Sequence, residues 1–161
     1  MRPTLRAAVL LCSAALVACG GGKADSGQAA TTTSSSGAAS AGSGLSDFEL
    51  KHGIGPVTEE VKVGPVDAAL VHEGQEVFQE KCSACHKADE RYVGPALGGV
   101  AERRSPAFIM NMALNPEGMY TKHPEVRKLL AEYMTQMPNQ QLTRDDARAV
   151  LEYLRTLPAP K

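Results

Sequence analysis

Two cysteines three positions apart, followed at once by a histidine, form the segment Cys82-Ser83-Ala84-Cys85-His86. The chain has 161 residues and four cysteines, and the other two, Cys12 and Cys19, lie near its N-terminus. Cysteine and histidine are uncommon residues, so a chain of this length contains this pattern by chance only about once in a thousand cases. The segment therefore indicates a specific chemistry.

The pattern C-x-x-C-H is the attachment signal of a c-type haem. Two thiols at this spacing near the end of a helix can form thioethers to both vinyl groups of one porphyrin. The adjacent imidazole then lies beneath the iron as its proximal ligand. Cys82 and Cys85 are therefore predicted to hold one covalent haem c, with His86 as an iron ligand.

Three other interpretations of the motif compete with this one. A thioredoxin-like redox pair needs a βαβ setting, and the sequence shows no strand pattern. A structural zinc ion needs two further ligands, usually a second C-x-x-C or paired histidines, and the sequence has no such pair. A simple Cys82–Cys85 disulfide fits the spacing but leaves His86 without a role.

The N-terminus has the pattern of an export signal. Residues 1–18 join two arginines to an apolar stretch that is too short to span a membrane as a mature helix. The end of this stretch, Leu16-Val17-Ala18-Cys19, resembles the lipobox of a bacterial lipoprotein, which implies that Cys19 is diacylated and becomes the mature N-terminus. The alternative is an ordinary secretory signal with an incidental cysteine. We expect a lipid anchor on a bacterial membrane, facing the periplasm or the cell exterior.

Residues 19–46 follow as the lipidated cysteine and a stretch rich in Gly, Ser, Ala and Thr. Such a composition buries too little apolar surface to offset chain entropy, so this segment is predicted to be a flexible tether. Residues 47–65 are an extension without an assignment, and residues 66–161 are the predicted folded domain. The whole chain has 17 Lys+Arg against 18 Asp+Glu, which leaves no positive excess for binding a nucleic acid.

Helix signals frame the predicted domain. Asp67 can cap a helix over residues 68–84, and Thr143 with Asp146 resembles a capping box for a last helix that stops at Pro158. Two middle helices are predicted between them. One starts at Ser105-Pro106 and runs to Pro116, and the other starts at Pro124 with an inner stripe of Val126, Leu129, Leu130, Tyr133 and Met134.

With these residues, the domain resembles a class I monohaem cytochrome c. Gly74 and Phe78 before the haem motif, and Val150 and Tyr153 in the last helix, match that family's crossing of its N- and C-terminal helices. The match covers about residues 66–157. The resemblance implies an all-α helical bundle around one covalent haem, acting as an electron carrier and not as an enzyme.

The family's next signature matches Gly94-Pro95-Ala96-Leu97. There the proline carbonyl typically accepts the other ring N–H of the proximal histidine, which here implies a bond from His86 to Pro95 that fixes the histidine tautomer. The alternative for Gly-Pro is an ordinary turn. The resemblance also implies that Leu97, with Tyr92 or Val93, packs on the porphyrin.

The distal ligand of the iron decides between classes of function. Met137 stands 51 residues after His86, precedes a proline and sits in a predicted loop before the last helix, which matches the axial ligand of the family. Met110, Met112 and Met134 fit helix stripes or flanks and are predicted to be core residues, with Met134 as the second candidate ligand.

The other histidines are rivals to Met137. His123 precedes a proline at a helix start, where a surface capping role is predicted. His52 lies in the unassigned extension, and His72 lies on the polar side of the first helix. Ligation by one of them, or an open distal position, are the alternatives to a methionine ligand.

Arg103 and Arg104 are predicted to be solvated surface charges; the alternative is that one of them pairs with a haem propionate. Aromatic residues make up only 4% of the chain, so the porphyrin is expected to serve as the central apolar body of the fold.

The predicted function is that of a tethered monomer that shuttles single electrons between respiratory redox partners. The segment 110–116 resembles small cytochromes associated with terminal reductases, such as nitrous oxide reductase; an oxidase is the other candidate acceptor. Two alternatives belong to other classes. One is a peroxide- or gas-reactive haem enzyme or sensor with an open distal site, and the other is a redox-inert structural lipoprotein with a Cys82–Cys85 disulfide.

Overall fold

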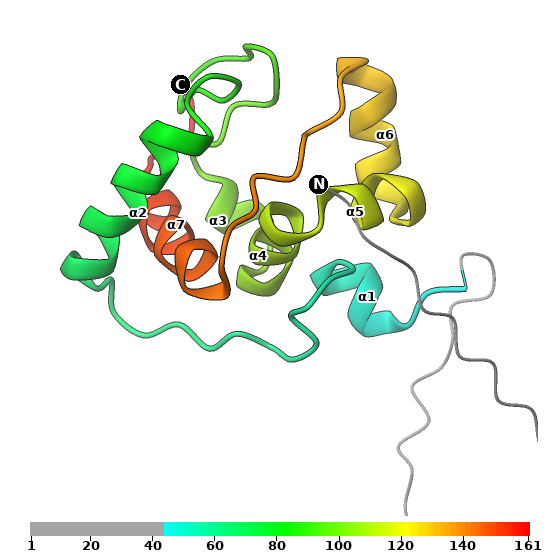
Figure 1. The fold of residues 1–161 in the computed structure, drawn as a ribbon, viewed down its shortest axis with the longest axis horizontal. Coiled ribbons are helices and arrows are strands. Elements are labelled where there is room, and N and C mark those ends of the chain that lie inside the picture. The colour runs from blue at the N-terminus through cyan, green and yellow to red at the C-terminus, as the bar shows by residue number, and fades with distance from the viewer. Residues whose placement is uncertain (1–43) are drawn as a thin grey trace, which may run out of the picture. The chain divides into compact units, whose positions relative to one another are not determined.

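A computed structural model describes residues 44–161; the predicted signal, Cys19 and most of the predicted tether lie outside the described residues. The described residues form helices and no strand, which confirms the predicted all-α class (Figure 1). Among them, no helix combines the length and apolar character needed to cross a bilayer. The helices are α1 (Asp47–His52), α2 (Ala68–Lys81), α3 (Val100–Arg103), α4 (Pro106–Leu114), α5 (Pro116–Lys122), α6 (Pro124–Tyr133) and α7 (Arg144–Thr156).

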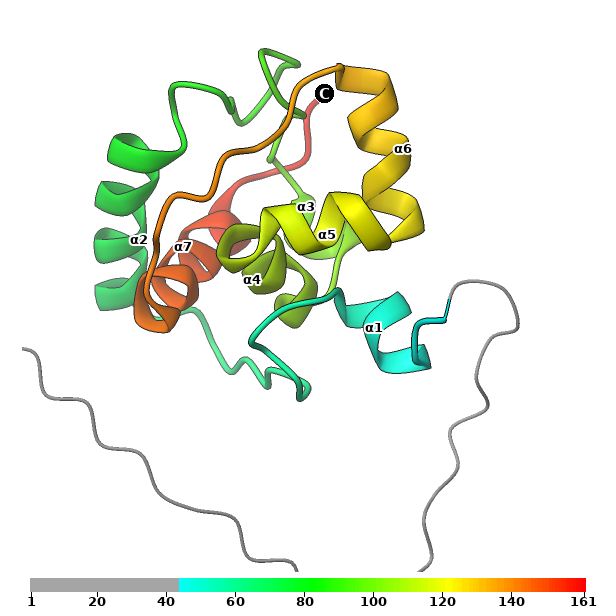
Figure 2. The same cartoon turned by 45° about the vertical axis from the view of Figure 1, so that its right-hand side comes forward.

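The crossing of α2 and α7 is the central contact of the fold, and both views show the two helices side by side (Figures 1 and 2). Gly74 is buried at the crossing, where a Cβ atom would collide with the backbone carbonyl of Ala149. Next to it, the rings of Phe78 and Tyr153 pack with centroids 5.2 Å apart. The close approach explains why glycine is present at this site despite its cost of about 1 kcal/mol in a helix interior.

Side-chain caps start both helices as predicted. The Asp67 carboxylate accepts hydrogen bonds from the backbone N–H groups of Ala69 and Leu70 in the first turn of α2, at 2.9 and 3.3 Å. Thr143 and Asp146 form a reciprocal capping box at α7. The helix predicted over residues 68–84 is α2, which ends earlier, at Lys81, because the cysteine motif itself forms the turn that follows.

The middle of the domain holds two helices more than predicted, the short α3 and α5. Pro116 ends α4 but also begins α5, because the Asn115 side chain accepts a hydrogen bond from the N–H of Gly118 and caps the new helix. The prediction of Met134 as a core residue is wrong. Met134 caps the end of α6 in the left-handed conformation (φ 53°), which turns its side chain off the inner stripe and leaves it 83% exposed.

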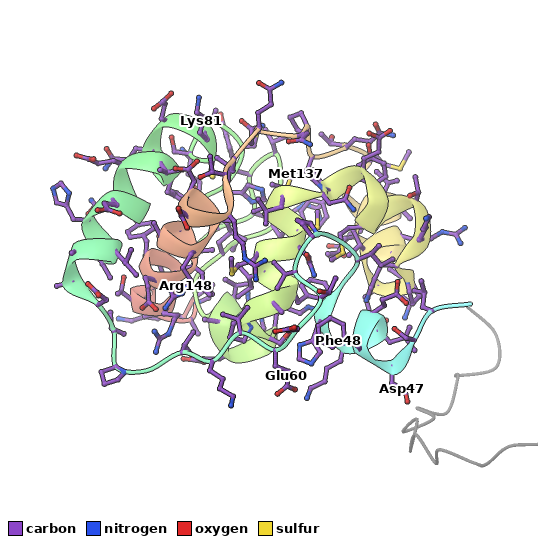
Figure 3. All side chains as sticks on the ribbon, turned by 60° about the horizontal axis from the view of Figure 1, so that its bottom comes forward. Asp47, Phe48, Glu60, Lys81, Met137 and Arg148 are labelled. Atoms are coloured by element: carbon purple, nitrogen blue, oxygen red, sulfur yellow. The ribbon has the colours of Figure 1, made fainter. Side chains whose placement is uncertain are left out.

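The extension that had no assignment packs on the domain. Asn111 of α4 is fully buried, and its amide nitrogen donates to the carbonyls of His52 and Val57 at 3.1 and 2.9 Å. Its amide oxygen accepts the Val57 N–H at 2.9 Å. Because one side chain satisfies three backbone groups, residues 52–57 are held against α4. Figure 3 labels Phe48 and Glu60, which come just before and just after this segment in the sequence.

The predicted surface role of His123 is wrong. Its side chain is fully buried, makes no side-chain cap to α6, and lies with its ring edge against Phe108. The Nε2 atom of His123 is 3.1 Å from the Leu50 carbonyl of α1. The docked extension therefore supplies a hydrogen-bond partner to this buried ring.

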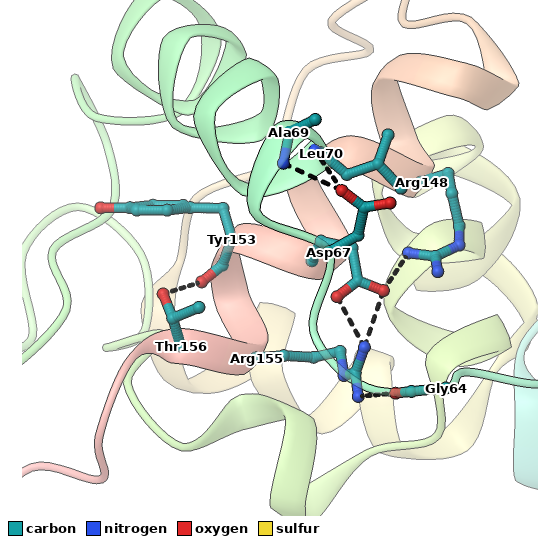
Figure 4. A network of polar contacts seen from close by, with 9 residues as sticks. Gly64, Asp67, Ala69, Leu70, Arg148, Tyr153, Arg155 and Thr156 are labelled. Atoms are coloured by element: carbon teal, nitrogen blue, oxygen red, sulfur yellow. Dashed lines mark hydrogen bonds and ion pairs between the residues drawn. The ribbon is translucent and has the colours of Figure 1, made fainter.

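A buried carboxylate joins the extension to the last helix. Glu152 of α7 has no exposed surface and is paired with Arg148 and Arg155, and Figure 4 labels these two arginines. Burial alone would raise the pKa of Glu152, but hydrogen bonds from the two guanidinium groups outweigh it and hold the pKa below its usual value. Arg155 also donates to the Gly64 carbonyl at 2.7 Å. Because the pKa is lowered in the folded state, this link stabilises the fold at neutral pH and is lost as acid protonates the carboxylate.

Candidate haem site

The cysteine motif continues directly from the end of α2. The backbone N–H of Cys82 donates to the Phe78 carbonyl, and the N–H of His86 donates to the Cys82 carbonyl, each at 2.9 Å. This tight turn brings both cysteine side chains and the imidazole to one cavity of about 290 Å³. The α2–α7 crossing thereby fixes the position of the whole motif.

The wall of this cavity is largely apolar and comes from helices far apart in the sequence. Leu97 and Met137 line the same space as the cysteine motif. A porphyrin needs an apolar cavity with a few polar groups that fix its orientation, and the residues present meet that requirement. Further apolar lining residues are Phe78, Val93, Val100, Phe108, Ile109, Met112, Ala113, Val126, Leu129, Leu130, Ala147, Val150 and Leu154.

The imidazole of His86 is oriented by its neighbours. Nδ1 lies 2.9 Å from the Pro95 carbonyl oxygen, and because that oxygen can only accept, Nδ1 carries the proton. The lone pair of the imidazole is then on Nε2, which is the nitrogen available to iron. A Cβ atom at Gly94 would lie 2.5 Å from Cε1 of His86, so only glycine lets this loop lie flat against the ring.

Met137 lies on the loop that joins α6 to α7, where Figure 3 labels it. Its side chain is partly buried, and it lines the same cavity as His86. The neighbouring Met134 points elsewhere and does not line the cavity. The structure therefore brings the two predicted iron ligands to one space and separates the second candidate methionine from it.

Cys82 and Cys85 form no disulfide in this structure. Without a bound group, burial, with a smaller contribution from Cys85, raises the pKa of the Cys82 thiol to about 11. Among residues 44–161, no group of three or more His, Cys, Asp or Glu side chains could hold a metal ion.

The remaining histidines lie away from the cavity. His72 is exposed on α2 and pairs with Glu76 at 3.8 Å. His52 is buried between the Ser105 hydroxyl, 2.9 Å from its Nδ1, and the Glu60 carboxylate, 3.2 Å from its Nε2. None of these rings, nor that of His123, lines the cavity with His86.

The two predicted surface arginines lie at the cavity and have protein partners. Arg103 donates to the Gly98 carbonyl at 2.8 Å, and Arg104 lies 4.7 Å from the ring centre of Phe108. Both line the cavity, so neither is a purely solvated charge. Tyr92, one of the residues predicted to pack on the porphyrin, is 55% exposed and does not line the cavity.

Sequence reasoning missed two parts of the site. Tyr120 lines the cavity from α5, a helix that the sequence did not predict, and the signal for it was the capping asparagine before Pro116. Arg91 binds the end of α6 from the loop after the cysteine motif. No local pattern indicates that contact, because its partners are 41 residues away.

Comparison with known proteins decides the family. A sequence model of the family "Cytochrome c" matches residues 71–158, which is more than half of the chain. The chain belongs to the cytochrome c family. This cytochrome is similar to the solved structure of cytochrome c from Rhodothermus marinus, at 48% identity and a TM-score of 0.63. That match covers 66% of this chain and 92% of the other.

Curated relatives agree with this assignment. Cytochrome c2 iso-2 of Magnetospirillum molischianum is 33% identical over 87 residues, which covers 47% of this chain and 90% of the relative. Cytochrome c2 of Rhodopseudomonas palustris is 42% identical over 45 residues, covering 28% of this chain and about a third (32%) of the relative. With the family come a covalently attached haem c and one-electron transfer as the general activity of a monohaem cytochrome.

Proposed function

We propose that this cytochrome is a lipid-anchored carrier that moves single electrons between respiratory redox partners, with His86 and Met137 as the two iron ligands. The observation that supports this most is that both side chains line one cavity, while Pro95 holds Nδ1 of His86 and leaves Nε2 available. The bound haem supplies a reversible one-electron Fe(III)/Fe(II) couple.

The chain's own residues adapt this site to electron transfer. A thioether sulfur from Met137 is a weak donor that favours the ferrous state and so raises the reduction potential. With His86 and Met137 both held on the iron, a bound haem would have no free coordination position for a substrate. The apolar wall from α4, α6 and α7 keeps water from the centre of the cavity.

The carrier role can be tested with carbon monoxide. We expect the reduced, folded protein to bind carbon monoxide slowly and weakly, because Met137 occupies the distal position. Rapid binding without denaturant would contradict the carrier proposal and support the open-site alternative. That alternative is not favoured by the relatives, whose names are cytochrome c2 and cytochrome c-553-like.

The proposed acceptor is a terminal reductase, such as nitrous oxide reductase, or an oxidase. The support is the resemblance of segment 110–116 alone. Met110 and Asn111 are 2% and 0% exposed, so this segment packs the core and holds the extension instead of facing a partner. We further propose that the carrier works as a monomer.

The proposed location is a bacterial membrane surface, facing the periplasm or the cell exterior. Its support is the lipobox-like sequence ending at Cys19 and the composition of residues 19–46. If flexible, a tether of this length has a root-mean-square span of roughly 30 Å. Such a span would let the haem domain reach partners near the membrane while it stays attached.

The anchor can be tested by replacing Cys19 with alanine in a bacterial host. We expect the wild-type protein in the membrane fraction with lipid incorporated, and the Cys19→Ala protein without lipid and outside that fraction. The matched control is Cys12→Ala, which alters the other N-terminal cysteine and is expected to leave lipidation intact. Equal membrane retention of the Cys19→Ala variant and the wild type would contradict the anchor.

A further inference from the structure

Arg91 connects two loops that the sequence keeps far apart. It belongs to the loop between His86 and Gly94, and its guanidinium reaches the last turn of α6. Nη1 donates to the Glu132 carboxylate at 3.2 Å, and Nη2 donates to the Glu132 backbone carbonyl at 3.0 Å. The same guanidinium lies 4.1 Å from the ring centre of Tyr133.

Both ends of this connection lead to a predicted iron ligand. On one side, the Arg91 loop is tied to the haem motif, because the N–H of Gly94 donates to the Cys85 carbonyl at 2.9 Å. On the other side, Tyr133 is the last residue of α6, and the irregular loop that follows carries Met137 four positions later. Arg91 therefore links the loop beside His86 to the start of the loop that holds Met137.

The geometry gives this contact more weight than an ordinary surface ion pair. The side chains of Arg91 and Glu132 are about half exposed, and such a pair alone contributes little. The backbone carbonyl of Glu132, however, lies in the last turn of α6, where no helical N–H is available to pair with it and the helix dipole is negative. One planar guanidinium satisfies this carbonyl, the carboxylate and the face of Tyr133 together.

We propose that Arg91 is a positioning residue for the distal ligand, holding the start of the 134–138 loop so that Met137 stays on the iron. This inference rests on the proposed ligand role of Met137. When the contact is absent, the loop opens more often, and an external ligand competes more successfully for the distal position. The loop that carries Arg91 thereby stabilises the Met137 ligand through its contact with the end of α6.

The test is equilibrium binding of imidazole to the ferric, full-length holoprotein, followed by loss of the far-red charge-transfer band. We expect Arg91→Ala to raise the apparent imidazole affinity about tenfold, as the loss of one exposed ion pair and one cation–π contact allows. Arg91→Lys retains the charge but not the planar fork, and we expect an increase of about threefold. If the alanine variant does not incorporate haem, the lysine variant decides the question.

Two control variants separate positioning from general destabilisation. Arg127→Ala removes an exposed arginine that lies on α6 itself, and Asp67→Ala removes the cap of α2 and lowers overall stability. We expect both to bind imidazole as the wild type does. An affinity of Arg91→Ala within twofold of wild type, or an equal change in either control, would overturn the positioning role. A wild-type protein with no far-red band would instead refute the methionine ligation on which the inference rests.

Discussion

Replacing Met137 with alanine is expected to lower the reduction potential by of order a tenth of a volt or more, because axial ligands set haem potentials over a range of about 0.8 V. The thioether stabilises the ferrous state, and a water molecule or a nitrogen ligand in its place does so less well. Of the two candidate ligands, Met137 and Met134, only Met137 lines the cavity with His86. The measurement is a potentiometric titration of the wild-type and variant holoproteins at one pH.

Met134→Ala is the matched control for this experiment. It removes an identical side chain three positions earlier on the same loop, one that is 83% exposed and absent from the cavity wall. We expect its potential and its far-red band to equal those of the wild type, whereas Met137→Ala loses the band. If Met137→Ala kept the wild-type potential and the far-red band, another residue would be the ligand. A lowered potential and a missing band in Met134→Ala would identify Met134 as that ligand.

Replacing both Cys82 and Cys85 with alanine is expected to abolish haem attachment and to remove most of the helical circular dichroism signal. The 290 Å³ cavity lies between α2, α4, α6 and α7, and these helices meet around it. Without the porphyrin, the apolar wall of this cavity is exposed to water, and the helices lose the central apolar body against which they pack.

The measurement compares far-ultraviolet circular dichroism of the double variant with that of the wild-type holoprotein. Ser83→Ala is the control, because it alters the same motif and removes only a hydroxyl that bonds the Gln79 carbonyl at 2.6 Å. We expect this control to retain haem and helicity. Native helicity in a double variant that carries no porphyrin would contradict the coupling of folding to the cofactor.

Local chemistry allowed the frame of the fold to be predicted. Asp67, Thr143 and the prolines at the starts of α4 and α6 act through residues within a few positions of themselves, so their effect can be read from the sequence. Close packing at Gly74 was also predictable, because glycine is costly in a helix unless another backbone lies against it, whereas α7 as the partner came from the family resemblance.

The docking of the extension could not be predicted in the same way. It depends on Asn111, whose amide forms hydrogen bonds with the backbone of Val57. The two residues are 54 positions apart in the sequence, and no periodic pattern predicts such a contact. The burial of His123 has the same origin, since its partner Leu50 lies 73 residues away on the docked segment. Met134 was misplaced for a different reason, because its stripe position holds only while the helix continues.

The contacts of the haem site also differ in how predictable they were, according to the sequence separation of the residues that form them. The cysteine motif and the His86–Pro95 pair are close in sequence, and their hydrogen bond follows from spacing within a known family pattern. The contacts of Arg91 with Glu132 and Tyr133 span about half of the folded domain and emerge only from the three-dimensional arrangement. The reason is physical: a ligand-bearing loop is positioned by whatever segment the fold places beside it.

The most direct test of this account is the optical spectrum of the purified full-length protein in its oxidised and reduced states. We expect a reduced haem c spectrum from porphyrin that stays attached on denaturation, together with the weak far-red band of a methionine-ligated ferric haem. A protein without covalent porphyrin would contradict the haem site itself. Covalent haem without the far-red band would contradict ligation by Met137.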